Sequence, residues 1–391
     1  MIPPKETPLH WRSKLLHPKS HAPEGFRSLT IPVYRGSTVI FDKAAQIVDD
    51  WRQQTHGYTY GMYGSPTVLE LGARIAEIEG AHYTFVVPSG QSAIGVVYLA
   101  FGEAGSHGLV PHSAYGPTKD MASGLLKRLG IEIEMYDPAI GSGIADLIRS
   151  NTSLIWTESP GSVTLEVQDV PAIVTVAKSR GVPVALDNTY AAGVLFDAFG
   201  HGVDVSIQAL TKYVGGHSDV LLGSVSVSSQ ELYEKVGSVW NQLGMSVSPD
   251  DASLALRGLQ TLGVRLERLE SSALKVARWL QSRPEIESVL HPALPDCSGH
   301  DLWRRDFEGS AGVFSFVFAP RVPREKVPVF IDYLALFEIG FSWGGTRSLA
   351  MIYPDLQRPN RDFGGRLVRL NIGLEEPDDL IADLSQALVG L

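Results

Sequence analysis

Short apolar runs alternate with helix-like stretches through the middle of the chain, and this alternation constrains the fold more than any other feature. Stretches such as 92–102 and 170–180 have the spacing of helices, and they lie between runs typical of buried strands. The pattern favours an α/β fold with a mainly parallel sheet and helices on both faces. The predicted strands are 83–87, 107–110, 131–135, 153–157, 183–187, 203–208 and 221–227.

Two further regions flank this predicted sheet. Residues 1–64 are rich in Pro, Gly, His and Tyr and are weakly periodic, so we expect an arm rather than a domain. An apolar stripe from 259 to 280 predicts a helical connector from an α/β domain (65–255) to a smaller α/β domain (256–391). The smaller domain is expected to contain strands at 312–318 and 367–373.

Composition excludes several classes of protein. The net charge of −10 argues against a general nucleic-acid surface. The only cysteine, Cys297, excludes an intrachain disulfide and a thiolate metal cluster, and we interpret it as structural. No metal is expected. The first residues lack the apolar core of a secretion signal, and no apolar run is long enough to cross a bilayer. We therefore expect a cytoplasmic protein without membrane contacts.

A lysine, Lys212, follows the predicted strand 203–208 in the stretch ALTKYVGGHSDV. A buried lysine is costly unless it is paired or takes part in chemistry. Asp187 ends another predicted strand, and the carboxyl ends of parallel strands share one edge of a sheet. By itself Asp187 is interpreted as a loop cap. Together, a Schiff-base lysine and an aspartate against a ring nitrogen are the usual protein partners of pyridoxal phosphate.

Three further features fit that hypothesis, each with a structural alternative. The Ser-Gly turn at Gly90 opens a predicted helix whose first amides could bind phosphate, a pattern that many α/β turns share, and Thr211 could add a hydroxyl. Tyr115 could lie over a pyridine ring or pack between helix and sheet. Arg369, inside an alternating apolar strand, could bind a substrate carboxylate or a protein acid.

Several segments together resemble the Cys/Met-metabolism family of pyridoxal-phosphate enzymes, and within it bacterial cystathionine β-lyases. The resemblance runs from about residue 25 to the C-terminus and implies a fold type I transferase with pyridoxal 5′-phosphate as cofactor. The segments that carry it are 158–173, 187–196, 204–219, 257–266, 291–295 and 342–345.

The resemblance implies a role for each matching position. Lys212 is expected to bind the cofactor through an imine and to transfer the proton, with Asp187 at the ring nitrogen and Tyr115 against the ring. The remaining implied roles are phosphate binding by Gly90, Gln91 and Thr211, contact with the neighbouring subunit's cofactor phosphate by Tyr60, and substrate binding by Ser342, Trp343 and Arg369.

The sequence departs from the family pattern at two positions. Met62 stands where relatives have an arginine that donates to phosphate across a subunit interface, and methionine has no hydrogen to donate. Ala209 stands where many relatives have a phosphate-binding serine. We interpret His217, in the GGHSD segment, as structural.

The resemblance also implies an activity and an assembly. The expected reaction is β-elimination of L-cystathionine or a related cysteine conjugate, and the expected assembly is a homodimer with shared active sites, paired into a homotetramer. A γ-acting synthase or lyase is the nearest alternative, and a non-catalytic binding protein is an alternative of another class. Product analysis separates β- from γ-elimination. A protein that stays colourless with added cofactor would favour the non-catalytic binding protein.

Overall fold

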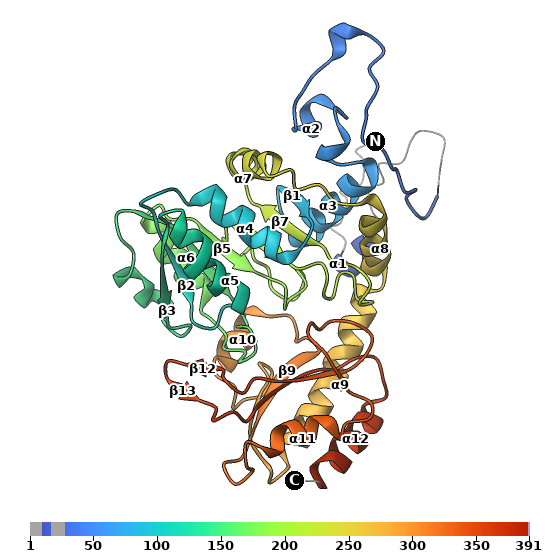
Figure 1. Cartoon of the computed structure of the whole chain (residues 1–391). Helices are drawn as coiled ribbons and strands as arrows, with labels where there is room; N and C mark the ends of the chain where they lie inside the picture. Colours follow the sequence, from blue (N-terminus) through green and yellow to red (C-terminus); the bar gives the residue numbers. More distant parts are fainter. Residues whose placement is uncertain (1–9, 17–27, 390–391) are drawn as a thin grey trace, which may run out of the picture.

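A computed structural model describes residues 10–16 and 28–389. Figure 1 shows a central α/β body, an N-terminal segment that extends from one end of it, and a second sheet with its helices at the other end. The chain therefore crosses the molecule from the extended segment to the C-terminus. None of the helices among the described residues combines the length and the apolar character needed to cross a membrane.

The central body is built on a seven-stranded sheet in the order β1-β7-β6-β5-β4-β2-β3. β7 runs antiparallel to both of its neighbours, and the pairs from β6 to β3 are parallel, which confirms the predicted mainly parallel sheet. The strands are β1 (Tyr83–Val87), β2 (His107–Pro111), β3 (Glu132–Tyr136), β4 (Thr152–Glu158), β5 (Val184–Asp187), β6 (Val205–Gln208) and β7 (Gly223–Val227).

Helices cover both faces of this sheet. One apolar cluster joins the sheet to α3, α6, α8 and α9, and a second joins it to α4 and α7. Because the central strands are buried on both faces, they appear in the sequence as continuous apolar runs. The helices and helical turns of the body are α3 (Pro66–Glu79), α4 (Gly90–Phe101), α5 (Gly116–Met121), a π-helical turn (Ala122–Leu126), a 3-10 turn (Gly141–Asp146), α6 (Val170–Ser179), α7 (Gln230–Gln242) and α8 (Pro249–Gln260).

The apolar stripe from 259 to 280 spans two helices instead of one. α8 ends at Gln260, and α9 (Leu262–Gln281) begins after Thr261, whose amide turns back to the Gly258 carbonyl. α9 leads into a second sheet in the order β10-β11-β14-β9-β8. The remaining elements are β8 (Ile286–Leu290), α10 (His300–Asp306), β9 (Val313–Phe318), α11 (Lys326–Asp332), β10 (Glu338–Ile339), β11 (Leu349–Ile352), the hairpin β12 (Gln357–Arg358) and β13 (Arg361–Asp362), β14 (Leu367–Asn371) and α12 (Pro377–Val389).

The N-terminal segment contains only short helices. They are α1 (Trp11–Leu16), a 3-10 turn (Ala44–Gln46), α2 (Gln53–His56) and a second 3-10 turn (Gly61–Tyr63). The limits that we predicted for the arm and for the two domains stay predictions, and the limit at residue 255 falls inside α8.

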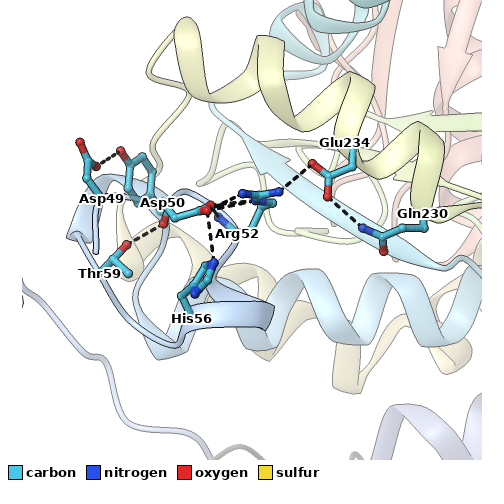
Figure 2. A network of polar contacts seen from close by, with 8 residues as sticks. Asp49, Asp50, Arg52, His56, Thr59, Gln230 and Glu234 are labelled. Atoms are coloured by element: carbon cyan, nitrogen blue, oxygen red, sulfur yellow. Dashed lines mark hydrogen bonds and ion pairs between the residues drawn. The ribbon is translucent and has the colours of Figure 1, made fainter. Parts of the chain in front are cut away.

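A polar clasp attaches this segment to α7 (Figure 2). Arg52 contacts the Asp50 carboxylate at 2.6 Å on one side and the Glu234 carboxylate of α7 at 3.6 Å on the other. His56 Nε2 lies 3.3 Å from Asp50 Oδ2, and the Thr59 hydroxyl donates to the Asp50 carbonyl at 2.8 Å. Asp50 thus ties together the loop that leads to Tyr60.

Candidate active site

The carboxyl ends of the parallel strands meet along one edge of the large sheet. β4 ends at Glu158 and β5 ends at Asp187, and these two residues are partners in the β4–β5 register. The turn after β6 carries Lys212, and Tyr115 follows β2. Segments far apart in the sequence therefore bring a lysine, two carboxyl groups and a tyrosine to the same edge.

Lys212 has no carboxylate in salt-bridge range among the described residues, and it bonds to the part of the chain that carries the second sheet. Its Nζ donates to Ser342 Oγ at 2.6 Å and lies 5.4 Å from the centre of the Trp343 ring. Burial and the nearby Arg369 charge lower the Lys212 pKa to about 8, although Asp187 acts in the opposite direction. A lysine of this kind has a substantial neutral fraction near neutral pH, which a base or nucleophile requires.

The loop that carries Ser342 is shaped to lie against the lysine turn. Ser342 has a φ of 78°, a backbone conformation that residues other than glycine rarely adopt. Gly344 also has positive φ, and a Cβ there would lie 3.0 Å from the Lys212 carbonyl carbon. The strained serine and the close glycine let the loop 342–345 approach the backbone of the turn directly. Strained residues of this kind are common at functional sites.

Asp187 is a buried carboxylate with partners on one side. Its Oδ1 accepts bonds from the Thr189 hydroxyl at 2.5 Å and the Thr189 amide at 3.1 Å. Burial raises the Asp187 pKa, and the Thr189 hydrogen bonds and the Lys212 charge oppose that rise. A further cationic N–H would favour the ionised form.

Glu158 lies beside Asp187 and holds the backbone of Tyr115. Its Oε2 accepts from the Tyr115 amide at 2.7 Å, and the Glu158 amide donates to Gln168 Oε1 at 2.8 Å. Burial, followed by the charge of Asp187, raises the Glu158 pKa well above its usual value. Two adjacent buried carboxyl groups disfavour double ionisation, so we assign the proton to Glu158 and the negative charge to Asp187.

Arg369 on β14 is a buried cation without a carboxylate partner among the described residues. Its Nη2 donates to the Ser342 carbonyl at 3.0 Å, and its guanidinium lies 5.4 Å from the centre of the Tyr353 ring. Burial lowers its pKa, and no carboxylate is among the groups that raise it. The guanidinium can therefore bind an incoming anion, for which a carboxylate has the matching geometry.

The start of α4 approaches the lysine turn closely. A Cβ on Gly90 would lie 2.6 Å from the Ala209 Cβ, so only glycine fits there. The amides of Gly90 and Gln91 begin the helix and have no acceptor inside it, whereas the Ser92 amide is capped by Ser89. Helix-terminal amides of this kind bind phosphate groups.

Two predicted residues have contacts that bear on their roles. Thr211 donates its only hydroxyl proton to the Leu222 carbonyl at 3.1 Å and accepts from the Leu222 amide, so donation to phosphate requires its hydroxyl to rotate. Tyr115 is the N-cap of α5 and is 44% exposed, so one side of its side chain is open to a ligand.

The structure does not bring Tyr60 into this group. Tyr60 lies on the arm, is 46% exposed, and packs edge-on against Tyr63 at 5.9 Å. Met62 is half-buried near the turn after α7, where a Cβ on Gly244 would lie 3.7 Å from its Sδ. His217 is exposed, and its Nδ1 lies 2.8 Å from the Gly215 carbonyl. Cys297 is buried, and burial raises its pKa to about 12, which suits a structural thiol.

Sequence reasoning missed Glu158, Thr189 and Tyr353. Glu158 could have been found, because it ends an apolar strand as Asp187 does. The proximity of Thr189 to Asp187 in the sequence was also a usable signal. Tyr353 gives no local signal, since its contact with Arg369 depends on the pairing of β11 with β14. Among the described residues, no group of three or more His, Cys, Asp or Glu is arranged to bind a metal.

Residues 12–389 match the family described as Cys/Met metabolism PLP-dependent enzyme. The chain belongs to this family. It is 46% identical over 360 residues to a protein named putative cystathionine beta-lyase from Rhizobium johnstonii, covering 91% of this chain and 90% of the relative. It is 42% identical to cystathionine beta-lyase MetC of Escherichia coli, covering 90% and 91%. The family resemblance noted from the sequence is thereby confirmed.

A solved structure shares the whole fold. The crystal structure of metB from Corynebacterium glutamicum has a TM-score of 0.90 and 29% identity, covering 97% of this chain and 98% of that one. The protein is therefore a PLP-dependent enzyme of fold type I. The residues at the strand edge fit this cofactor. Lys212, with its lowered pKa, suits the aldehyde, and the buried Asp187 carboxylate suits the ring nitrogen. The amides at the start of α4, where Gly90 lies close to the lysine turn, suit the phosphate.

Proposed function

We propose that this enzyme is a carbon–sulfur β-lyase that cleaves L-cystathionine to homocysteine, pyruvate and ammonia. The observation that carries the proposal is the Lys212 amine, which lies 2.6 Å from Ser342 Oγ with its pKa lowered to about 8. The names of the similar proteins from R. johnstonii and E. coli support the choice of reaction and substrate.

The residues that would hold pyridoxal phosphate are those described at the strand edge. We assign the phosphate to the amides of Gly90 and Gln91 with Thr211, the ring nitrogen to Asp187 and the ring face to Tyr115. When bound, the cofactor supplies an aldehyde that joins an amine and a ring that accepts electrons. The negative charge on Asp187 would keep the ring nitrogen protonated.

The chain's own residues orient the substrate and move one proton. Arg369 binds the α-carboxylate through its free guanidinium edge, and Ser342 and Trp343 border the same position. Lys212 Nζ takes the proton from the substrate's α-carbon, which requires the neutral amine. With a pKa of about 8, roughly a quarter of the lysine is neutral at about pH 7.5, compared with roughly a thousandth for an ordinary lysine.

The overall reaction balances with one water molecule. The bond between the β-carbon and sulfur breaks, and its electron pair leaves with the sulfur of homocysteine, which takes a proton. Water adds to the remaining three-carbon fragment, and pyruvate and ammonia are released. No oxidant or reductant is needed.

A substrate panel tests the proposal. Wild-type protein and Lys212→Ala would be incubated with cystathionine, cysteine conjugates and O-substituted homoserines, with pyruvate, 2-oxobutyrate and thiol as readouts. We expect pyruvate and thiol from cystathionine, and a loss of ~10³-fold or more in the variant because a base and covalent partner is removed. Predominant 2-oxobutyrate would favour the γ-acting alternative and contradict the proposal.

We further propose a homodimer with shared active sites, itself paired into a homotetramer. The support is the exposed Tyr60 on the arm, which contacts none of the site residues of its own chain that are described above. If Tyr60 acts on the neighbouring subunit, Tyr60→Ala and Lys212→Ala subunits mixed 1:1 regain about a quarter of wild-type activity, because half the dimers carry one intact site. Activity no higher than the two separate variants would contradict shared sites. Cytoplasmic location stays a prediction.

A further inference from the structure

Arg265 is a buried arginine at the junction of α8 and α9. It is 6% exposed, and its three nitrogens all donate: Nη1 to the Tyr213 carbonyl at 2.6 Å, Nη2 to the Gly258 carbonyl at 2.7 Å, and Nε to Thr261 Oγ1 at 3.1 Å. Burial alone lowers its pKa, to about 10, and no carboxylate among the described residues opposes this effect. Its partners are thus backbone and hydroxyl oxygens instead of an anion.

Two glycines allow the close packing around this guanidinium. Gly216, with a φ of +72°, lies so close that a Cβ there would be 2.1 Å from Arg265 Nη1. A Cβ on Gly258, in the last turn of α8, would be 2.2 Å from the Val214 carbonyl oxygen. The end of α8 and the turn after β6 therefore meet backbone to backbone, and the Arg265 side chain from α9 packs against Gly216.

The geometry suits an arginine and no other donor. Buried carbonyls need hydrogen-bond donors, and the planar guanidinium presents five N–H groups in a fixed fork that reaches three segments at once. A lysine has one nitrogen and can reach fewer of these acceptors. A buried charge without partners is costly. We therefore explain the burial of the Arg265 guanidinium by the three segments whose oxygens it binds.

The fastened segment is the one that carries Lys212. The Tyr213 carbonyl that Arg265 binds belongs to the residue after Lys212, and the Lys212 carbonyl itself accepts from the Gly216 amide at 2.7 Å. α9 leads from Arg265 into the domain that supplies Ser342 and Arg369. The guanidinium therefore links the lysine turn to the connection between the two halves of the site.

We propose that Arg265 is a positioning residue that locks the turn 209–216 onto the α8–α9 junction and so keeps Lys212 Nζ aligned with Ser342. The inference rests on the proposed role of Lys212. It assigns a function in the reaction to a residue that lies outside the site and contacts none of the groups proposed to bind cofactor or substrate.

Four variants test this role of Arg265. Arg265→Met removes the donors, Arg265→Lys retains the charge with a single nitrogen, and Gly216→Ala displaces the guanidinium without deleting it. Arg278→Met is the matched control, because Arg278 lies exposed on the same helix. Amide hydrogen exchange of 209–216 is measured in the cofactor-free protein and the holoenzyme, together with kcat and KM for cystathionine.

We expect exchange of 209–216 to accelerate ~10-fold or more in Arg265→Met and Gly216→Ala, and less in Arg265→Lys. The corresponding kcat should fall ~10- to 100-fold while KM stays within about 3-fold, because a displaced reactive group lowers turnover more than binding. Arg278→Met should match the wild type.

Three results would overturn the inference. One is a folded Arg265→Met protein with unchanged exchange in 209–216 and unchanged kcat. Another is an acceleration spread evenly over α8, α9 and the sheet, which indicates general destabilisation. A third is an equal effect in Arg278→Met. If wild-type protein yields no pyruvate, the proposed function fails, while the exchange comparison still decides whether Arg265 locks the turn.

Discussion

The lysine turn and the N-terminal arm both carry residues expected at the active site, but the turn is attached to the rest of the chain at more points than the arm loop. The turn is fastened by Leu222, by Arg265 and by the loop of Ser342, all outside itself. The hydrogen bonds of the arm loop lie largely within it: Tyr63 to Asp49, Thr59 to Asp50 and Gln53 to the Tyr60 carbonyl.

If the proposed dimer with shared sites forms, this difference separates the residues that act within their own chain from those that act on the neighbouring subunit. The lysine, the buried carboxylate and the arginine are positioned by packing within the chain, so changes there should act on turnover and substrate binding. The arm loop is prefolded and attached to α7 through the exposed Arg52–Glu234 pair, so changes there should act mainly on a neighbouring subunit.

The largest effect on the packed region is expected at Arg369. Arg369→Ala should lower kcat/KM for cystathionine ~100- to 1000-fold, chiefly through KM, because a charge-assisted and bidentate contact with the α-carboxylate is lost. Steady-state kinetics check this, with the exposed Arg321→Ala as the control. An effect below about 5-fold would show that another group binds the carboxylate.

The arm should respond through cofactor affinity instead. Met62→Arg is expected to tighten cofactor binding ~10-fold, because a guanidinium can donate charge-assisted bonds to phosphate where a thioether cannot. Spectroscopic titration of cofactor-free protein gives the dissociation constant, and Met62→Leu should leave it unchanged. If the arginine variant brings no gain, the arm does not reach the phosphate, and the contrast between the two regions loses its functional meaning.

The titration of Lys212 tests whether Arg369 and Asp187 set its pKa. In cofactor-free protein, the pH profile of Lys212 acylation, followed by peptide mass mapping, should have its midpoint near the pKa of about 8. Arg369→Met should move the midpoint upward because a like charge is removed, and Asp187→Asn should move it downward because an opposite charge is removed. Shifts in the reverse directions would show that the charges do not act on Lys212 in this way.

The smallest effect is expected at the clasp of the arm. Glu234→Gln should change the free energy of unfolding by less than ~1 kcal/mol, since the Arg52–Glu234 pair is exposed and 3.6 Å apart. Chemical denaturation measures this, and cofactor affinity should stay within about 3-fold. A larger loss of affinity with unchanged stability would show that the clasp sets the position of Tyr60.

Local patterns were enough to predict much of the protein. The strand runs 83–87 and 107–110 and the helix 170–180 agree closely with β1, β2 and α6, because burial on both faces leaves an apolar signal in consecutive residues. Lys212 and Asp187 were found in the same way, as polar residues at the ends of apolar strands.

Other features depended on segments that meet only after folding. The contact of Lys212 with Ser342 spans 130 residues, and the register that sets Glu158 beside Asp187 joins two separate strands. The burial of Arg265 also depends on contacts with the lysine turn. Buried faces and strand ends could be predicted from the amino-acid order, since they are properties of neighbouring residues. Contacts between distant groups could not, because those distances depend on the packing of whole elements against one another.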